Sequence, residues 1–323
     1  ITTLQTDLFT TTTKGLYLKA DFPFYANLRF SVFNHGEIIT SKGIPSTGLT
    51  FHAANAPISV SNGILNFMTS VLATEDNTTV TISGYKNTVQ FSNGTNGLTN
   101  PTLSFTLNKG QSYILDGNGT IAGNWDGFIG AKIQANKPVN VTNGNFNGQY
   151  AGNIPLSSDI LMDQSVPVNR LGSEFALVKG NGSIGSNMEG ALVIATENNT
   201  QIYVNAEGLP LATLNIGQYF VVPGTKYILQ GSGHYNLYLK TTKNAYVYQM
   251  LAGNSSTTDE VATGGLNFIP ALNCYLPKQI NELGFINENF VHTNVNPSGI
   301  LNIPTKLNLV TERDAVVTVN GLQ

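Results

Sequence analysis

The feature that most constrains the fold is a short acidic motif that occurs three times in the chain. The three stretches are VLATEDNTTVTI at residues 71–82, VIATENNTQIYV at 193–204 and LVTERDAVVTV at 309–319. Glu75, Glu197 and Glu312 stand in register in them, at separations of 122 and 115 residues. Recurrence at a long and nearly constant period indicates a repeated supersecondary unit rather than one large domain.

Two further landmarks recur in the same order around each acidic motif. One is a strand-like segment, LYLKADFPFYAN at residues 16–27, GAKIQANKPVNV at 130–141 and LYLKTTKNAYVY at 237–248. The other is a glycine followed closely by an aromatic residue, at Gly48, Gly172 and Gly284. After the acidic motif, the first two copies share Leu-Asn-x-Gly-Gln-x-aromatic, which begins at Leu107 and at Leu214.

Strand signals dominate between these landmarks. Runs such as GALVIAT, TQIYVNAE and YNLYLKTT are short, rich in Val, Ile, Leu and Tyr, and bounded by turn-forming residues. No long segment keeps the 3.6-residue period of an amphipathic helix. We therefore predict an all-β chain of tandem β-sandwich-like repeats of roughly 115 residues with no substantial helix. The expected units are residues 1–116, 117–230 and 231–323.

The third copy stops where the first two continue. Its last residues, VTVNGLQ, end just after Asn320-Gly321, a strong two-residue hairpin signal. We therefore expect unit 3 to be truncated inside a hairpin and the natural polypeptide to be longer. Residues 1–13 are expected either to belong to a unit whose beginning is missing or to supply a strand to the third unit.

The acidic motif itself is interpreted as a hairpin with a three-residue loop. The last loop position is Asn77, Asn199 or Asp314, residue types that tolerate a left-handed backbone. A repeated metal site should keep its charges, yet the position of Asp76 becomes Asn198 and then Arg313. We expect the three glutamates to lie at the strand-to-turn junction and to accept local hydrogen bonds.

Composition narrows the function classes. Charged residues make up 11% of the chain and the net charge is −3, so no basic field is available for nucleic acid. No apolar run is long enough to span a membrane. Cys274 is the only cysteine, which excludes a disulfide framework and a cysteine-based zinc site.

Three motifs align with a known type of module: Ile133–Val139 as I-x-A-x-K-P-V, Val166 to Phe175 around Gly172, and Ala73–Ile82. With them in register, the sequence resembles the IgGFc-binding-protein N-terminal type of module, most closely over residues 129–204. The resemblance implies a secreted or surface-anchored, adhesin-like protein. Bacterial modules of this type occur in large Bacteroidota surface proteins, often exported by the type IX system and associated with gliding or attachment. Immunoglobulin binding belongs to a mammalian member, and no residue pattern here carries it over.

The best local candidate for a metal is DGNGTIAGNWDG at residues 116–127. Asp116, Asn118 and Asp126, with Asn124, offer the oxygen ligands that calcium prefers, but their spacing is not that of an EF-hand. We favour an ordinary turn here, and we expect no cofactor or metal. If a metal ion did bind at this loop, calcium would be the candidate. Trp125, the only tryptophan, either stacks on a sugar ring or, as we favour, anchors the loop.

No catalytic or cofactor-binding constellation is recognisable. Gly180-x-Gly182-x-x-Gly185 has the form of a dinucleotide motif, but a strand rather than a helix should follow it, which favours a hairpin loop. The four histidines lack partners at ligand spacing: His35, His52, His234 and His292. We expect a protein that is not an enzyme.

The resulting prediction is a fragment of a large, repetitive cell-surface adhesin or filament protein, secreted or displayed outside the cell, that presents or spaces binding surfaces. Its expected partners are further domains of the same polypeptide, neighbouring surface-protein subunits or extracellular glycans. The alternative is a carbohydrate-binding module of a secreted polysaccharide-processing protein.

Overall fold

The fold is known from a computed structural model. It describes residues 4–22, 24–32, 35–150, 158–180, 189–230, 233–251, 264–273, 290–292, 301–303, 309–311 and 314–318. The predictions for Gly182, Gly185, Cys274, Gly284 and the Asn320-Gly321 turn lie outside the described residues. The chain divides into two compact units, Ile1–Leu272 and Asn273–Gln323.

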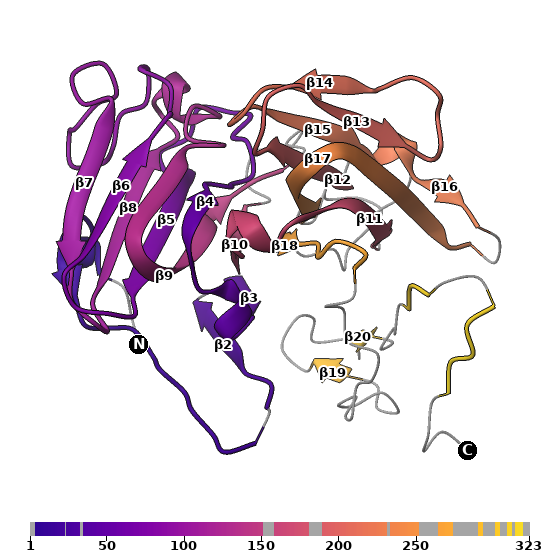
Figure 1. The fold of residues 1–323 in the computed structure, drawn as a ribbon, viewed down its shortest axis with the longest axis horizontal. Coiled ribbons are helices and arrows are strands. Elements are labelled where there is room, and N and C mark those ends of the chain that lie inside the picture. The colour runs from indigo at the N-terminus through magenta and orange to yellow at the C-terminus, as the bar shows by residue number, and fades with distance from the viewer. Residues whose placement is uncertain are drawn as a thin grey trace. The chain divides into compact units, whose positions relative to one another are not determined.

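The all-β prediction is confirmed (Figure 1). Helix in the described residues is limited to 3-10 turns of three residues each: η1 (Gln5–Asp7), η2 (Ile44–Ser46), η3 (Ala122–Asn124), η4 (Val168–Arg170) and η5 (Gly224–Lys226). All other regular structure is strand, arranged as two eight-stranded sheets and two hairpins. The hairpins are β2 (Asn27–Val32) with β3 (His35–Thr40), and β19 (Phe290–His292) with β20 (Leu301–Ile303).

The first sheet is built around one long strand, β9. Its members are β1 (Thr11–Thr12), β4 (Gly48–His52), β5 (Asn66–Ala73), β6 (Thr78–Ser83), β7 (Thr102–Leu107), β8 (Ser112–Asn118), β9 (Lys132–Gly148) and β10 (Asp159–Gln164). The order is β1-β8-β5-β9-β6-β7, and β10 and β4 also pair with β9. Every pair is antiparallel.

The second sheet repeats this plan around β17. Its members are β11 (Gly172–Val178), β12 (Glu189–Ala195), β13 (Thr200–Val204), β14 (Ala212–Leu214), β15 (Tyr219–Pro223), β16 (Ile228–Leu229), β17 (Tyr235–Leu251) and β18 (Gly265–Phe268). Strand β17 pairs with β12 and β13 as β9 pairs with β5 and β6, while β11 and β18 take the places of β4 and β10. The short β16 has no counterpart among the described strands of the first sheet.

The expected hairpin at the acidic motif is wrong. Strands β5 and β6 do not pair with each other; both pair with β9, Ala73 opposite Val139 and Val80 opposite Ala135. Strand β4 occupies the other edge of β9 over the same residues, so β5 and β6 must follow one another along a single edge. Pairing is interrupted between those points, where Pro138 has no N–H to donate to a ladder. The acidic motif is therefore the turn that links β5 and β6, which pair with successive parts of β9. We call this turn a corner.

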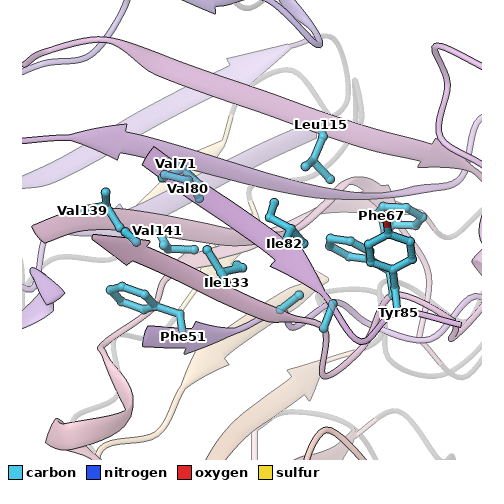
Figure 2. Packing of buried hydrophobic residues seen from close by; sticks show 14 of the residues in the cluster. Phe51, Phe67, Val71, Val80, Ile82, Tyr85, Leu115, Ile133, Val139 and Val141 are labelled. Carbon is cyan, nitrogen blue, oxygen red and sulfur yellow. The ribbon is translucent and has the colours of Figure 1, made fainter. Parts of the chain in front are cut away.

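Folding at the corner encloses the first hydrophobic core. In β9, Ile133, Ala135, Val139 and Val141 are fully or almost fully buried. Figure 2 shows side chains from β4, β5, β6, β8 and β9 meeting in this one interior. Near one end of it Phe67 stacks on Phe128, with the ring centroids 4.5 Å apart. The alternation of apolar residues in these strands thus fills a sandwich-like interior.

A separate apolar cluster joins the two sheets. In β17, Ala245 and Val247 face the second core, whereas Tyr246 and Tyr248 belong to the joining cluster. From the first half of the chain the cluster takes Ala54, Ala56, Ile129 and Leu161. Strand β17 is therefore buried on both faces from Ala245 to Tyr248, which explains why this part of its sequence is continuously apolar.

The N-terminal residues extend the first sheet. Thr11 and Thr12 pair with Tyr113 and Ser112 of β8, and Phe9 packs against the first core. The described part of residues 1–13 thus lies on the first sheet, in neither of the two places expected for it. Strand pairing does not by itself define folding units, so the division into residues 1–116, 117–230 and 231–323 stays a prediction.

Candidate functional site

The corners formed by the acidic motifs were the first candidate site, because the motif occurs three times. Asn77, Asn199 and Asp314 have φ values of 55°, 58° and 67°, which confirms the left-handed backbone expected at these three positions. Asn and Asp adopt this conformation more readily than most residues because their short polar side chains can bond locally. The three copies of the motif therefore share a left-handed residue at the same position.

The Leu-Asn-x-Gly-Gln motif completes each corner. The Asn77 amide donates to Asn108 Oδ1 at 3.1 Å, and the Asn108 amide donates to Gln111 Oε1 at 2.7 Å. In the second sheet, the Asn199 amide donates to Asn215 Oδ1 at 3.3 Å. The Asn215 amide in turn donates to Gln218 Oε1 at 2.8 Å. The two motifs are 31 residues apart in the first sheet and 16 in the second, and they are thus halves of one hydrogen-bonded turn.

The glutamates of the motif act through their backbone. Thr78 Oγ1 donates to the Glu75 carbonyl at 2.7 Å, and Thr200 Oγ1 donates to the Glu197 carbonyl at 2.8 Å. Both glutamate residues are exposed. No group of three or more His, Cys, Asp or Glu residues in the described part of the chain could hold a metal ion. The corner is built to turn the chain, and the carboxylates are free to face solvent.

Asp116 and Asn118, two of the candidate calcium ligands, have different roles in the structure. Asp116 is buried in β8, and its Oδ1 atom has no hydrogen-bond partner. Burial raises the pKa of this carboxyl, against a smaller lowering by a hydrogen bond with Ser92. Asn118 is used within the protein: its Nδ2 donates to the Gly63 carbonyl at 2.8 Å, and its Oδ1 accepts from the Thr120 amide at 2.8 Å.

Asn124 and Asp126, the other two candidate ligands, form hydrogen bonds or ion pairs with other parts of the protein. Asn124 is fully buried and exchanges hydrogen bonds with the backbone of Gln90, at 2.9 Å and 2.8 Å. Asp126 pairs with Lys86 Nζ at 2.8 Å and accepts from the Tyr219 hydroxyl of the second sheet at 3.1 Å. Its carboxylate therefore already has a cationic partner and a donor.

Trp125 is half-buried, and its indole Nε1 donates to the Gly119 carbonyl at 2.9 Å. Its own carbonyl accepts from the Ile58 amide at 2.8 Å. These bonds fasten the loop to itself and to the segment after β4. A sugar stacking on this ring would meet an indole whose single donor is already engaged.

One buried carboxylate with several hydrogen-bond donors is a group that the sequence did not single out. Glu189 opens β12, is 2% exposed, and accepts from the Gly180 amide at 3.0 Å and 2.8 Å and from Gln249 Nε2. Burial raises the pKa of its carboxyl. Burial together with Glu189 raises the pKa of Tyr150 to about 12 and that of Tyr227 still further. The only sequence signal is an acidic residue at the head of the apolar run EGALVIA.

Gln249 also donates to the Val178 carbonyl at 2.8 Å. Glu189 and Gln249 thus hold the end of β11, where the ladder to β17 finishes. Among the histidines, His52 is buried, and its Nδ1 lies 2.8 Å from the Gly130 carbonyl. Burial lowers the pKa of His52, which favours the neutral ring. These groups brace strands.

The fold defines a class of protein, an all-β module built from antiparallel sheets. The family model described as IgGFc binding protein matches residues 44–322, and the chain belongs to that family. Domains of the family are typically extracellular. No helix in the described residues is both long and apolar enough to cross a membrane. No curated protein and no solved structure gives a significant match.

Proposed function

We propose that this chain is a non-enzymatic, extracellular attachment module, in which tandem β units of one plan present and space binding surfaces on a large, repetitive surface protein. The observation that carries the proposal is the repetition of one strand plan in two eight-stranded sheets joined by a shared apolar cluster. Repeat proteins of this kind owe their stability to contacts between neighbouring units.

The contacts between the two eight-stranded sheets favour a fixed arrangement of the two sheets. Across the joining cluster, the Tyr246 hydroxyl donates to the Val166 carbonyl at 2.6 Å, and the Tyr248 hydroxyl lies 2.7 Å from Ser165 Oγ. Both tyrosines are fully buried. Satisfied hydrogen bonds within an apolar contact hold one geometry, because alternatives would leave buried polar atoms unpaired. Such a pair of units is suited to hold a binding surface at a set distance from its anchor.

The family assignment supports the extracellular and binding parts of the proposal. The resemblance to Bacteroidota surface modules extends it to cell attachment and gliding, with export by the type IX system. The proposed partners are further domains of the same polypeptide, neighbouring surface-protein subunits and extracellular glycans. The name of the family refers to the Fc region of immunoglobulin G, which makes Fc one probe among several for this chain.

Retention under flow tests the proposal. Beads coated with the chain are passed over glass, mucin, immunoglobulin G Fc and a panel of immobilised glycans, and retained beads are counted as shear rises. We expect retention on at least one surface above that of beads coated with heat-unfolded chain. Equal release from every surface would contradict an attachment function.

The same assay separates attachment from the carbohydrate-binding alternative. Retention on a glycan surface that disappears with Trp125→Ala, while circular dichroism shows an intact fold, would favour a sugar platform at Trp125. We expect Trp125→Ala to leave retention unchanged, because the indole is half-buried and hydrogen-bonded within its own loop.

A further inference from the structure

A largely buried ion pair joins two segments that lie far apart in the sequence. Lys42 follows the end of β3, Asp163 lies in β10, and Lys42 Nζ lies 2.6 Å from Asp163 Oδ1. Their side chains are 19% and 13% exposed. The Lys42 amide also donates to Gln164 Oε1 at 2.6 Å, which fixes the backbone of Lys42 against β10. The lysine nitrogen is therefore held in contact with one carboxyl group.

The surroundings of this pair reduce the charge on the lysine. Lys42 Nζ lies 5.6 Å from the centroid of the Phe268 ring. Burial lowers the pKa of Lys42, against the opposing effects of the charge of Asp163 and of their hydrogen bond. Two ions taken out of water lose solvation, which brings the neutral amine and the neutral acid closer in energy to the ion pair. A neutral, desolvated lysine amine is a nucleophile.

The carboxyl group of Asp163 is oriented by backbone donors. Its Oδ1 accepts from the Gln164 amide at 2.7 Å, and its Oδ2 accepts from the Phe268 amide at 2.9 Å. If the lysine nitrogen attacked Cγ, negative charge would develop on Oδ2, where the Phe268 N–H would stabilise it. The same N–H would remain bonded to the carbonyl oxygen of an amide product.

A third ionisable group, Glu37 of β3, lies beside the pair. Strand β3 packs against β10. Burial raises the pKa of Glu37 to about 7, with smaller raising by the charges of Asp159 and Asp163 and lowering by backbone hydrogen bonds with Ile38 and Met162. A large share of Glu37 is therefore protonated near neutral pH. Such a carboxyl group can give a proton to a leaving oxygen and take one from a nitrogen.

We propose that Lys42 and Asp163 form an intramolecular isopeptide bond, with Glu37 as the proton carrier. Proton transfer within the ion pair gives a neutral amine and a neutral carboxylic acid. Nζ then forms a bond to Cγ and the Cγ–Oδ1 bond breaks. Oδ1 leaves as water, with the acid proton and one proton from the nitrogen, so the step needs no oxidant or other reactant. Contact between the two groups, away from bulk water, favours the amide over its hydrolysis.

The bond would fasten the first sheet covalently. Lys42 and Asp163 are 121 positions apart, and β4 and β10, beside which they lie, both pair with β9. A covalent link that closes so long a loop restricts the unfolded chain, as a disulfide does. The inference concerns how the fold is held together and does not depend on the attachment function.

Intact mass spectrometry tests the bond without any substitution. The folded chain is held at neutral pH, unfolded in denaturant and weighed. We expect a mass one water molecule below that of the sequence, and proteolysis should release a branched peptide that contains both Lys42 and Asp163. A chain that stays at its full sequence mass would overturn the proposal and leave the pair an ordinary ion pair.

Two variants distinguish this bond from other losses of water. Lys42→Arg keeps the positive charge but has no primary amine, so it should stay at full mass with an unchanged circular dichroism spectrum. Lys86 provides the matched control, because its Nζ lies 2.8 Å from Asp126 but the two side chains are 57% and 35% exposed. Lys86→Arg should lose water as the unmodified chain does. Loss of water that persists in Lys42→Arg, or that disappears in Lys86→Arg, would refute the proposal.

Glu37→Gln tests the proton transfer separately from the shape of the site. Glutamine has nearly the shape of glutamic acid but cannot carry the proton. When the cross-linked fraction is followed after cell-free synthesis, we expect the bond to form more slowly by a factor on the order of ten or more. An unchanged rate would contradict the role given to Glu37.

Discussion

We predict that replacing Gly130 with alanine destabilises the protein, because the added methyl group would disturb the contact between the two sheets. Gly130 precedes β9 with φ +82°, and a Cβ there would lie 1.9 Å from the carbonyl oxygen of Gly217, in the turn before β15. The obstacle is backbone, so no side-chain rotation relieves it. Gly217 has φ +75°, and its own Cβ would lie 3.1 Å from the Gly130 carbonyl oxygen, a much milder contact. The two glycines thus form a direct backbone contact between the sheets.

The cost of Gly130→Ala has two parts. A left-handed backbone costs an L-residue about 1–2 kcal/mol. Forcing an extra carbon into a packed contact costs about 1–3 kcal/mol more. We therefore expect Gly130→Ala to lower the free energy of unfolding by about 2–5 kcal/mol. Gly110 is the matched control, because it stands at the position of Gly217 with φ +77° and its Cβ would meet nothing within 4 Å.

Urea unfolding followed by the fluorescence of Trp125, the only tryptophan, measures these differences. Gly110→Ala should show only the backbone cost of about 1–2 kcal/mol. Gly217→Ala should lie close to it, and Gly130→Ala should be lower by a further 1–3 kcal/mol or so. If Gly130→Ala and Gly110→Ala have the same unfolding free energy, then the close approach of the two sheets at Gly217 is not a constraint, and the reasoning fails.

Three further predictions concern single side chains. Thr200→Ala should lower the free energy of unfolding by about 1 kcal/mol, since it removes the bond to the Glu197 carbonyl, and Thr200→Ser should restore most of it. Burial raises the pKa of Glu37 from 4.5 to about 7, so its stabilisation of the β2–β3 hairpin is complete below pH 4.5 and lost toward pH 7. Hydrogen exchange in that hairpin, corrected for intrinsic rates, should accelerate over this window, and Glu37→Gln should remove the dependence. Tyr219→Phe should lower the melting temperature slightly by removing a bond to Asp126, with no change in circular dichroism.

Local sequence was a reliable guide to the corners because a left-handed backbone is a property of one residue and its neighbours. The choice of Asn or Asp at residues 77, 199 and 314 predicted the sign of φ at all three positions. The same local information could not show which strand would lie beside the turn. The partner of both β5 and β6 is β9, about 60 residues further along the chain, so the motif was taken for a hairpin.

The candidate ligands of residues 116–127 show a second limit. Asp, Asn and Gly at close spacing serve equally well as metal ligands and as turn formers. The difference depends on what else each oxygen meets. Asp126 meets Lys86 and Tyr219, and Asn124 meets the backbone of Gln90, none of which can be inferred from the loop alone. Glu189 could not be recognised from the sequence either, because its burial depends on contacts with β17 and with the end of β11.

By itself, the sequence determined the all-β class, the period of the repeated landmarks and the left-handed residue in each of the three corners. These depend on residue type, alternation and local backbone preference, which act over a few positions. Only the tertiary structure decided that β9 pairs with both β5 and β6, and that β17 pairs with both β12 and β13. It also decided that Tyr246 and Tyr248 belong to the contact between the two sheets. Those facts depend on which distant surfaces bury one another, and apolar surface is not specific to one partner until the whole core has closed.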